Sequence, residues 1–190
     1  MAPRNFRKLF LESINTLTNQ TSIPWFKLEF TFDDEQGIII DKTTGEKCLI
    51  FPQTRLEQIF TRLTDLFQSN AQVILIETFQ ATGKWYVNEV PEKIKAEEAA
   101  FSKSAVQRLK DGGFGKPAIV GFKPETAEVQ SRIWNNLFAE MIYDGSTYCN
   151  LVEAYVSGHY EQLTGVTPET QKTKCVGKNY PICEWRFRLS

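Results

Sequence analysis

The sequence lacks a long apolar run, a charge imbalance and a signal segment, and each absence excludes a class of protein. No stretch of about 18 apolar residues occurs among its 190 residues, so no transmembrane helix is predicted. Its 22 basic and 23 acidic residues leave a net charge of −1, which gives no electrostatic footprint for binding nucleic acid. The N-terminus has no apolar core followed by a small-residue cleavage site, so we expect a cytoplasmic, reducing environment.

Catalytic and cofactor signatures are also scarce. The stretch from Gly112 to Pro117 fails as a phosphate-binding loop, because Pro117 stands where a metal-binding hydroxyl is needed. No glycine fingerprint for a dinucleotide follows a predicted strand. The single histidine, His159, falls on a predicted helix, where a structural role is commoner than a partnership with a catalytic cysteine. We therefore do not expect a self-contained enzyme.

The patterns that are present predict one α+β domain over residues 1–190, in which an antiparallel sheet packs against several helices. An amphipathic helix over residues 5–17 is an N-terminal extension of that domain. Further helices are predicted over residues 54–67, 70–85, 92–110 and 148–164, and strands over residues 26–32, 38–40, 48–51, 118–122 and 129–141, followed by two closing strands. The apolar faces of the first two helices exceed what one small sheet covers, which predicts a homodimer or a hetero-assembly with a related chain.

The C-terminal third carries several motifs in order. A helix with an internal glycine, Gly158, ends at Thr164-Gly165, and Cys175 and Cys183 then follow with the spacing C-x7-C. This segment resembles the 4-vinyl reductase domain family, whose C-terminus has these features, and the stretch over residues 47–52 is similar to that family's entry. The resemblance covers most of the chain from about Gly45. It implies an α+β fold related to the TRAPP trafficking subunits, which commonly dimerise, and members that hold aromatic or acyl ligands.

A metal site is predicted at three cysteines. Cys149 lies near the start of the predicted helix, and Cys175 and Cys183 lie on the following strands, so their thiols can converge; zinc commonly takes four such ligands. The resemblance implies an acidic fourth position three residues before the second cysteine, but Lys172 stands there. Glu169, His159 or a water molecule are the alternatives for that position. The competing interpretation is three buried cysteines that pack as small hydrophobes.

A ligand-binding wall is predicted on the same helix and the strand beside it. Aromatic rings offer a large apolar surface, and a tyrosine adds a polar tip that can orient a ligand. An internal glycine is expected to keep one side of this wall open. The residues of the predicted wall are Trp134 and Phe138 on the strand and Tyr148, Tyr155, Gly158 and Tyr160 on the helix. The alternative is that these rings fill the core.

The resemblance implies a non-enzymatic binding or assembly factor. Such a factor holds a hydrophobic small molecule, a tetrapyrrole such as chlorophyll or its precursor, and assists assembly of a photosystem. One alternative is a reductase that acts on a tetrapyrrole vinyl group with an external reductant, and another is a scaffold subunit without a ligand. The partners implied are the ligand, a second related chain and a membrane-protein complex, with a cytoplasmic location that includes the periphery of the thylakoid membrane.

Overall fold

The structure is a computed structural model that describes most of the chain. It describes residues 30–33, 38–42, 45, 47–49, 52–89, 109–110, 112–143 and 146–189. Within them the elements follow in this order: β1 (Phe30–Asp33), β2 (Ile38–Asp41), β3 (Lys47–Cys48), α2 (Gln53–Phe67), α3 (Ser69–Glu89), β4 (Lys116–Lys123), η1 (Pro124–Thr126), β5 (Glu128–Trp134), α6 (Leu137–Glu140), β6 (Ile142–Tyr143), β7 (Ser146–Thr147), α7 (Asn150–Thr164), β8 (Glu169–Lys174), η2 (Val176–Lys178) and β9 (Cys183–Arg188).

A four-stranded antiparallel sheet with the order β4-β5-β9-β8 positions the candidate site. Alternate side chains of a strand point to opposite faces. In β9, accordingly, Cys183, Trp185 and Phe187 are buried while Arg186 is exposed. Glu184 is the exception, because it is buried although it belongs to the other face. The strand β9 thus contributes apolar side chains to the core and one buried carboxylate beside it.

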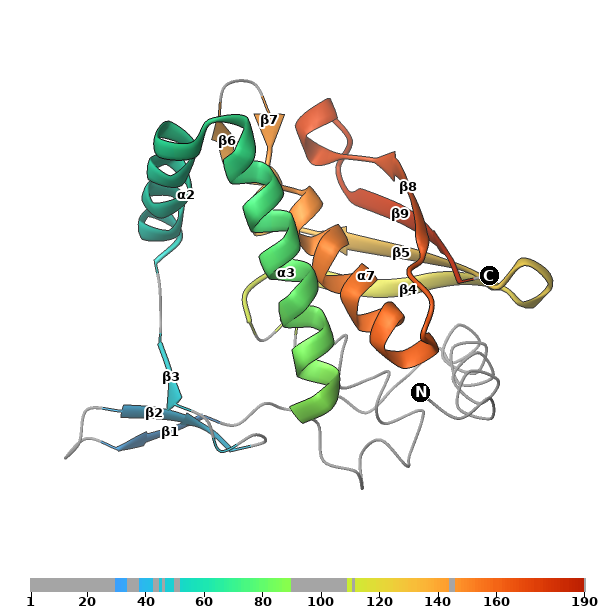
Figure 1. Ribbon diagram of the computed structural model, residues 1–190, viewed down its shortest axis with the longest axis horizontal. Helices are drawn as coiled ribbons and strands as arrows, with labels where there is room; N and C mark the ends of the chain where they lie inside the picture. The colour runs from blue at the N-terminus through green and yellow to red at the C-terminus, as the bar shows by residue number, and fades with distance from the viewer. Residues whose placement is uncertain are drawn as a thin grey trace.

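The helices α7 and α3 complete the core. In Figure 1, α7 lies across the four-stranded sheet and α3 lies beside α7. Buried residues occur all along α7, as expected for a helix with protein on more than one side. The helix ends at Gly165, which adopts a left-handed conformation and donates its N–H to the carbonyl oxygen of Glu161 at 2.8 Å. The predicted glycine stop is therefore present in the structure.

The helices α3 and α7 approach each other at two glycines. A Cβ atom added at Gly158 would lie 2.8 Å from the carbonyl carbon of Gln80 and closer still to its oxygen. A Cβ atom added at Gly83 would meet the backbone carbonyl of Tyr155 in the same way, and it would lie 3.1 Å from the backbone nitrogen of His159. Because these neighbours are backbone atoms of the opposite helix, each glycine permits a helix contact that no other residue allows.

Smaller antiparallel sheets accompany the main one. The strands β1, β2 and β3 form a three-stranded sheet, and β6 pairs with β7. None of the helices in the described part of the chain combines the length and the apolar character that a membrane crossing requires.

The predicted α+β architecture with an antiparallel sheet against several helices is confirmed. The prediction of one strand over residues 129–141 is wrong in its second half. The strand β5 ends at Trp134, and Asn136 then begins the short helix α6 by accepting the N–H of Phe138 on its side chain at 3.1 Å. The predicted helix over residues 5–17 and most of the one over residues 92–110 lie outside the described residues.

Candidate functional site

A cavity lies between α7 and the four-stranded sheet. Its volume is about 60 Å³, and its walls are almost entirely apolar. Since one water molecule needs roughly 10–15 Å³, this space holds about four to six water-sized groups, and it is smaller than the cavity of about 150 Å³ that binds benzene in an engineered protein. The lining residues come from α7, from β4, β5 and β9, and from the end of the preceding segment: Leu109, Pro117, Ala118, Ile119, Ser131, Arg132, Ile133, Val152, Tyr155, Val156, His159, Tyr160, Trp185 and Phe187.

One face of α7 forms the helical wall of this cavity. The helix contributes Val152, Tyr155, Val156, His159 and Tyr160, which follow the spacing i, i+3, i+4, i+7 and i+8. Residues with that spacing share one side of an α-helix. The cavity is therefore a consequence of the helical period of this segment set against the alternating strands below it.

Two polar groups reach the otherwise apolar cavity from α7. Burial lowers the pKa of His159 to about 3, so its imidazole is neutral at physiological pH. Its ring stacks on that of Tyr86, with the ring centroids 5.8 Å apart. Burial also raises the pKa of Tyr160 to about 12, although a hydrogen bond with Ser131 acts in the opposite direction. Both groups are uncharged, and a neutral imidazole offers one donor and one acceptor nitrogen.

Arg132, the charged residue in the lining, forms an ion pair with Glu184 on the face of the sheet opposite the buried Trp185. Its guanidinium donates to the carboxylate of Glu184, which also accepts a hydrogen bond from Thr173 Oγ1 at 2.7 Å. Burial acts to raise the pKa of Glu184, but the hydrogen bonds from Arg132, Thr173 and Gln130 outweigh it and lower that pKa to about 2. The Arg132 charge is thereby compensated and does not make the cavity a site for an anion.

Two residues of the predicted ligand-binding wall, Tyr155 and Tyr160, line this cavity. The expectation that Gly158 keeps one side of the wall open is wrong, because Gly158 is buried against the backbone of Gln80 on α3. Phe138 lies on α6 rather than on a strand. Trp134 is outside the lining, at the end of β5, where the ammonium of Lys116 lies 5.9 Å from its ring centroid.

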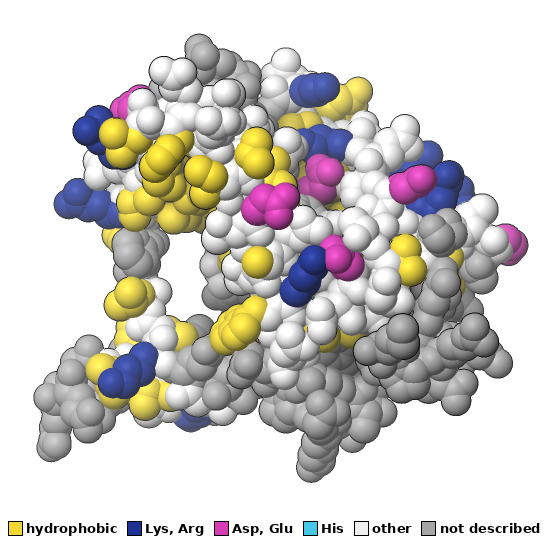
Figure 2. All heavy atoms as spheres, in the orientation of Figure 1, with side chains coloured by type: hydrophobic (Ala, Val, Ile, Leu, Met, Phe, Trp, Pro, Cys, Tyr) yellow, Lys and Arg dark blue, Asp and Glu magenta, His cyan; other side chains and the backbone are white. Residues whose placement is uncertain are grey.

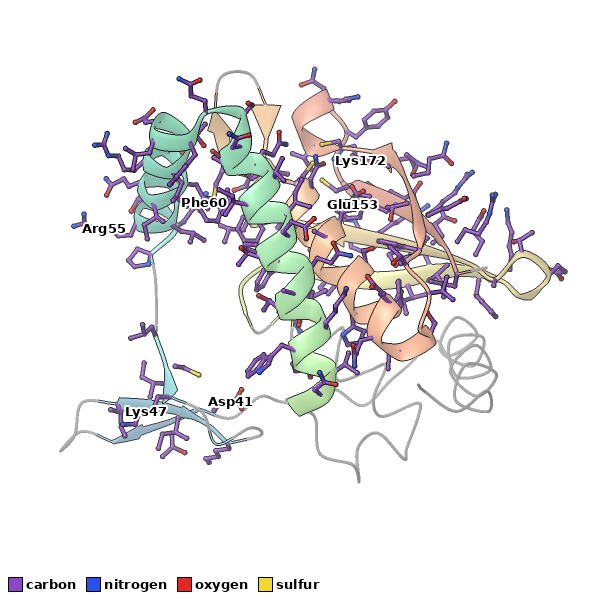
Figure 3. All side chains as sticks on the ribbon, in the orientation of Figure 1. Asp41, Lys47, Arg55, Phe60, Glu153 and Lys172 are labelled. Atoms are coloured by element: carbon purple, nitrogen blue, oxygen red, sulfur yellow. The ribbon has the colours of Figure 1, made fainter. Side chains whose placement is uncertain are left out.

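Phe138 and Tyr148 do not line the cavity and belong to an aromatic cluster in the core, which Phe114 connects to Tyr155 of the cavity wall. Phe60 of α2 stacks on Phe138 with a centroid distance of 5.9 Å, and it lies 5.2 Å from the ring of Tyr148. The hydroxyl of Tyr148 is hydrogen-bonded to Thr64 Oγ1 at 2.8 Å. Figure 3 shows Phe60 on α2, between this helix and the body of the domain. Phe138 and Tyr148 therefore fill the core, which is the alternative given for the predicted wall.

The strand side of the cavity and His159 were not predicted from the sequence. Aromatic residues of α7 were predicted, whereas the helical period selects Val152, Val156 and His159 together with Tyr155 and Tyr160. That period is visible in the sequence and could have placed His159 beside the two tyrosines. The lining residues on β4, β5 and β9 could not have been found in this way, because these strands pair with one another from distant parts of the chain.

The three predicted metal ligands do converge in the structure. Cys149, Cys175 and Cys183 are buried, and their sulfur atoms lie within 4.8 Å of one another. The sulfurs of Cys149 and Cys175 are 3.2 Å apart. The backbone N–H of Val176 donates to the sulfur of Cys183 at 3.4 Å. Hydrogen bonding to Cys149 and burial raise the pKa of Cys183, so this thiol holds its proton.

A lysine stands beside these sulfurs. The ammonium of Lys172 donates to the sulfur of Cys149 at 3.0 Å and to the side-chain oxygen of Asn150, and it lies 3.8 Å from a carboxylate oxygen of Glu153. Burial acts to lower the pKa of Lys172, but the hydrogen bond to Cys149 and the nearby acidic groups outweigh it and raise that pKa. Three sulfurs could therefore hold a metal ion, whereas a cation lies against one of them. Zinc at these cysteines stays a prediction.

The sequence matches no known protein family model and no curated protein. Among solved structures, the phenol-responsive sensory domain of the transcription activator PoxR, crystallised with phenol, aligns over 93% of this chain and 88% of its own, with a TM-score of 0.66 and 13% identity. A trafficking protein particle complex subunit 3 from Naegleria fowleri, covalently bound to palmitic acid, aligns over 73% of this chain and 95% of its own, with a TM-score of 0.48 and 12% identity. The first of these likenesses shows that this chain has the fold of the PoxR sensory domain.

Proposed function

We propose that this chain is a non-enzymatic small-molecule-binding domain whose ligand occupies the cavity between α7 and the four-stranded sheet. The observation that carries the proposal is an apolar cavity of about 60 Å³ with a neutral imidazole in its wall. Apolar pockets with a few placed polar groups are the common form of ligand sites in proteins. The shared fold with the phenol-bound PoxR domain is consistent with this proposal.

The cavity size selects the ligand class. The available volume favours the smallest ligands: a single ring enters only if the lining side chains move apart, and a tetrapyrrole macrocycle exceeds the volume several-fold. The predicted tetrapyrrole can use this cavity only for an edge group, such as a vinyl substituent, with the macrocycle outside. We therefore place a compact apolar ligand first. A chlorophyll-type ligand of a photosystem assembly factor, as predicted for a member of the 4-vinyl reductase family, is the second candidate.

Ligand chemistry follows from the groups in the wall. Apart from the compensated Arg132–Glu184 pair, the polar groups named here are neutral, so an ionised ligand would lose its hydration without gaining a counter-charge. A neutral ligand with one hydroxyl or carbonyl can exchange a hydrogen bond with His159. Such a bond contributes about 0.5–1.5 kcal/mol, or a few-fold to roughly tenfold in affinity. We therefore expect phenol to bind more tightly than toluene.

The test is a titration of the purified protein with phenol, toluene and a porphyrin, followed by calorimetry and by the fluorescence of Trp185 in the cavity wall. Ile119→Phe enlarges a side chain of β4 that shares the cavity face of the sheet with Ser131 and Trp185, and it should lower phenol affinity roughly tenfold or more, equivalent to about 1.4 kcal/mol. Val120→Phe is the matched control, since Val120 is an exposed residue of the same strand outside the lining.

The outcomes separate the candidates. Saturable phenol binding that Ile119→Phe weakens and Val120→Phe leaves unchanged supports the compact ligand. Porphyrin binding that Ile119→Phe weakens supports the tetrapyrrole. If neither ligand binds the folded protein, the cavity is not a site for either. Turnover of a divinyl tetrapyrrole with an added reductant would replace the binding proposal with the reductase.

A scaffold function has one observation in its favour. The helix α2 buries Phe60 but leaves Leu66 exposed, and Val73 is exposed on the neighbouring helix. Figure 2 shows hydrophobic side chains gathered over α2, at the upper left of the molecule. Contiguous apolar surface of this kind marks interaction sites. A ligand-binding domain and a subunit of a larger assembly are compatible, because this surface and the cavity are formed by different residues.

A further inference from the structure

The cysteine cluster holds a positive charge that already belongs to the protein. Cys149 and Asn150 at the start of α7 both accept hydrogen bonds from the ammonium of Lys172 on β8. Figure 3 shows Lys172 and Glu153 near each other, where β8 passes the first turn of α7. An ammonium has three donors and no lone pair, so it binds to a sulfur but cannot bind a metal ion.

A zinc ion at the three sulfurs would lie next to this ammonium. Zinc–sulfur bonds are about 2.3 Å long, and Lys172 Nζ is 3.0 Å from the sulfur of Cys149. The two cations would therefore be within about 5 Å of each other in a buried site, where charges are poorly screened. The three sulfurs thus favour zinc, whereas the neighbouring ammonium of Lys172 disfavours it.

The two side chains given as alternatives for the fourth ligand, His159 and Glu169, are elsewhere, and Glu153 beside Lys172 is already hydrogen-bonded. His159 is on the same helix as Cys149 but ten residues further on, which is about 15 Å along an α-helix. Glu169 begins β8 and accepts a hydrogen bond from Arg188 at 3.3 Å. Glu153 accepts a hydrogen bond from the indole of Trp185 at 2.8 Å. Across the described residues, the sulfur group that could hold a metal includes no histidine or carboxylate.

We propose that Lys172 takes the place of a metal ion at this cluster, and that its ammonium joins the start of α7 to β8 without zinc. The cluster then works as a hydrogen-bonded contact between Cys149, Asn150 and the lysine, covered by Cys175 and Cys183. It follows that a single change, Lys172→Glu, converts the cluster into a zinc site, because a carboxylate supplies the missing fourth ligand and removes the repelling charge.

The experiment compares the wild-type protein with Lys172→Glu, each refolded with zinc present and then dialysed. Arg186→Glu is the control, since it makes the same charge change at an exposed position on the opposite face of β9. Zinc is counted by elemental analysis. Cobalt(II) serves as the optical probe, because its visible bands report tetrahedral coordination and its near-ultraviolet band reports bonds to thiolates.

We expect zinc below stoichiometry and no tetrahedral cobalt spectrum in the wild type and in Arg186→Glu, with about one metal per chain in Lys172→Glu. A chelator should lower the melting temperature of Lys172→Glu only. One tightly held zinc in the wild type would overturn the proposal, and so would a folded Lys172→Glu that binds no cobalt. If Lys172→Glu does not fold, Lys172→His replaces it. Failure of both to fold with zinc present also counts against the proposal.

Discussion

The contact between α3 and α7 gives the sharpest stability prediction. Replacing Gly158 by Ala adds a methyl group 2.8 Å from the carbonyl carbon of Gln80, a backbone atom that cannot rotate away. Carbon atoms in contact prefer about 3.5–4.0 Å, so the two helices must separate by about 1 Å at this point. Such a displacement weakens the packing along the most extensive helix–helix contact of the described residues.

The change in the free energy of unfolding caused by Gly158→Ala is the difference between two opposing effects. Overpacking of a tight interior costs about 1–3 kcal/mol, and the upper end applies where the neighbour is backbone. Alanine favours the helix by about 1 kcal/mol over glycine. We expect Gly158→Ala to lose about 2 kcal/mol, which lowers the melting temperature by about 4–8 °C in a domain of this size.

The assay is urea unfolding followed by circular dichroism, with the slope of the transition compared between variants to confirm that the unfolding process is unchanged. Gly83→Ala should behave like Gly158→Ala. Because separation of the helices makes room for both methyl groups, the double variant should lose less than the sum of the single losses. Thr82→Ala, at an exposed position of α3, is the control and should stay within about 0.5 kcal/mol of the wild type. A Gly158→Ala protein as stable as the wild type would refute the close contact.

Three further predictions concern pH, an ion pair and assembly. Because the pKa of His159 is about 3 in the fold and 6.5 in an unfolded chain, acid favours unfolding. Stability should be nearly level above about pH 7 and should fall by about 2 kcal/mol between about pH 7 and 5. Urea titrations at each pH should show this loss in the wild type and not in His159→Gln. Glu184→Gln should lower the free energy of unfolding by about 1–3 kcal/mol in thermal unfolding, since it removes the buried carboxylate that pairs with Arg132. Glu169→Gln, at an exposed ion pair, should lower it by less than about 0.5 kcal/mol. Equal losses would contradict this difference between the buried and the exposed pair. Sedimentation should show a dimer or a larger species, and Leu66→Glu should dissociate it. A wild-type monomer at a protein concentration of about tens of micromolar, which is enough to reveal weak contacts, would count against assembly through α2.

The sequence predicted the elements whose patterns are local. The period of the residues around Tyr155 gave α7, and the alternation of Trp185 with Arg186 gave β9. The end of β5 was missed because Asn136 starts a helix whose four residues are too few to show a period. In the same way Gly158 was wrongly expected to leave an open wall, since its neighbour Gln80 is distant in the sequence.

The candidate site shows the same division. The convergence of the three cysteines followed from the order of one helix and two strands, and the structure brings their sulfurs together. The cavity did not follow from the sequence, because Ile119 and Ile133 reach it only through the pairing of β4, β5 and β9. A pattern along one segment indicates which side of that segment is buried. It does not indicate which other segment packs against that side.

The order of the main sheet has a consequence for how the chain is made. The strand β9 lies between β5 and β8, although roughly 50 residues separate the end of β5 from the start of β9. A ribosome that adds about 5–20 residues each second needs several seconds to bridge that interval. During this time the edge of β5 is unpaired, and unpaired edges attract other strands. Slower translation between Trp134 and Cys183 lengthens this exposure and should therefore favour aggregation of nascent chains.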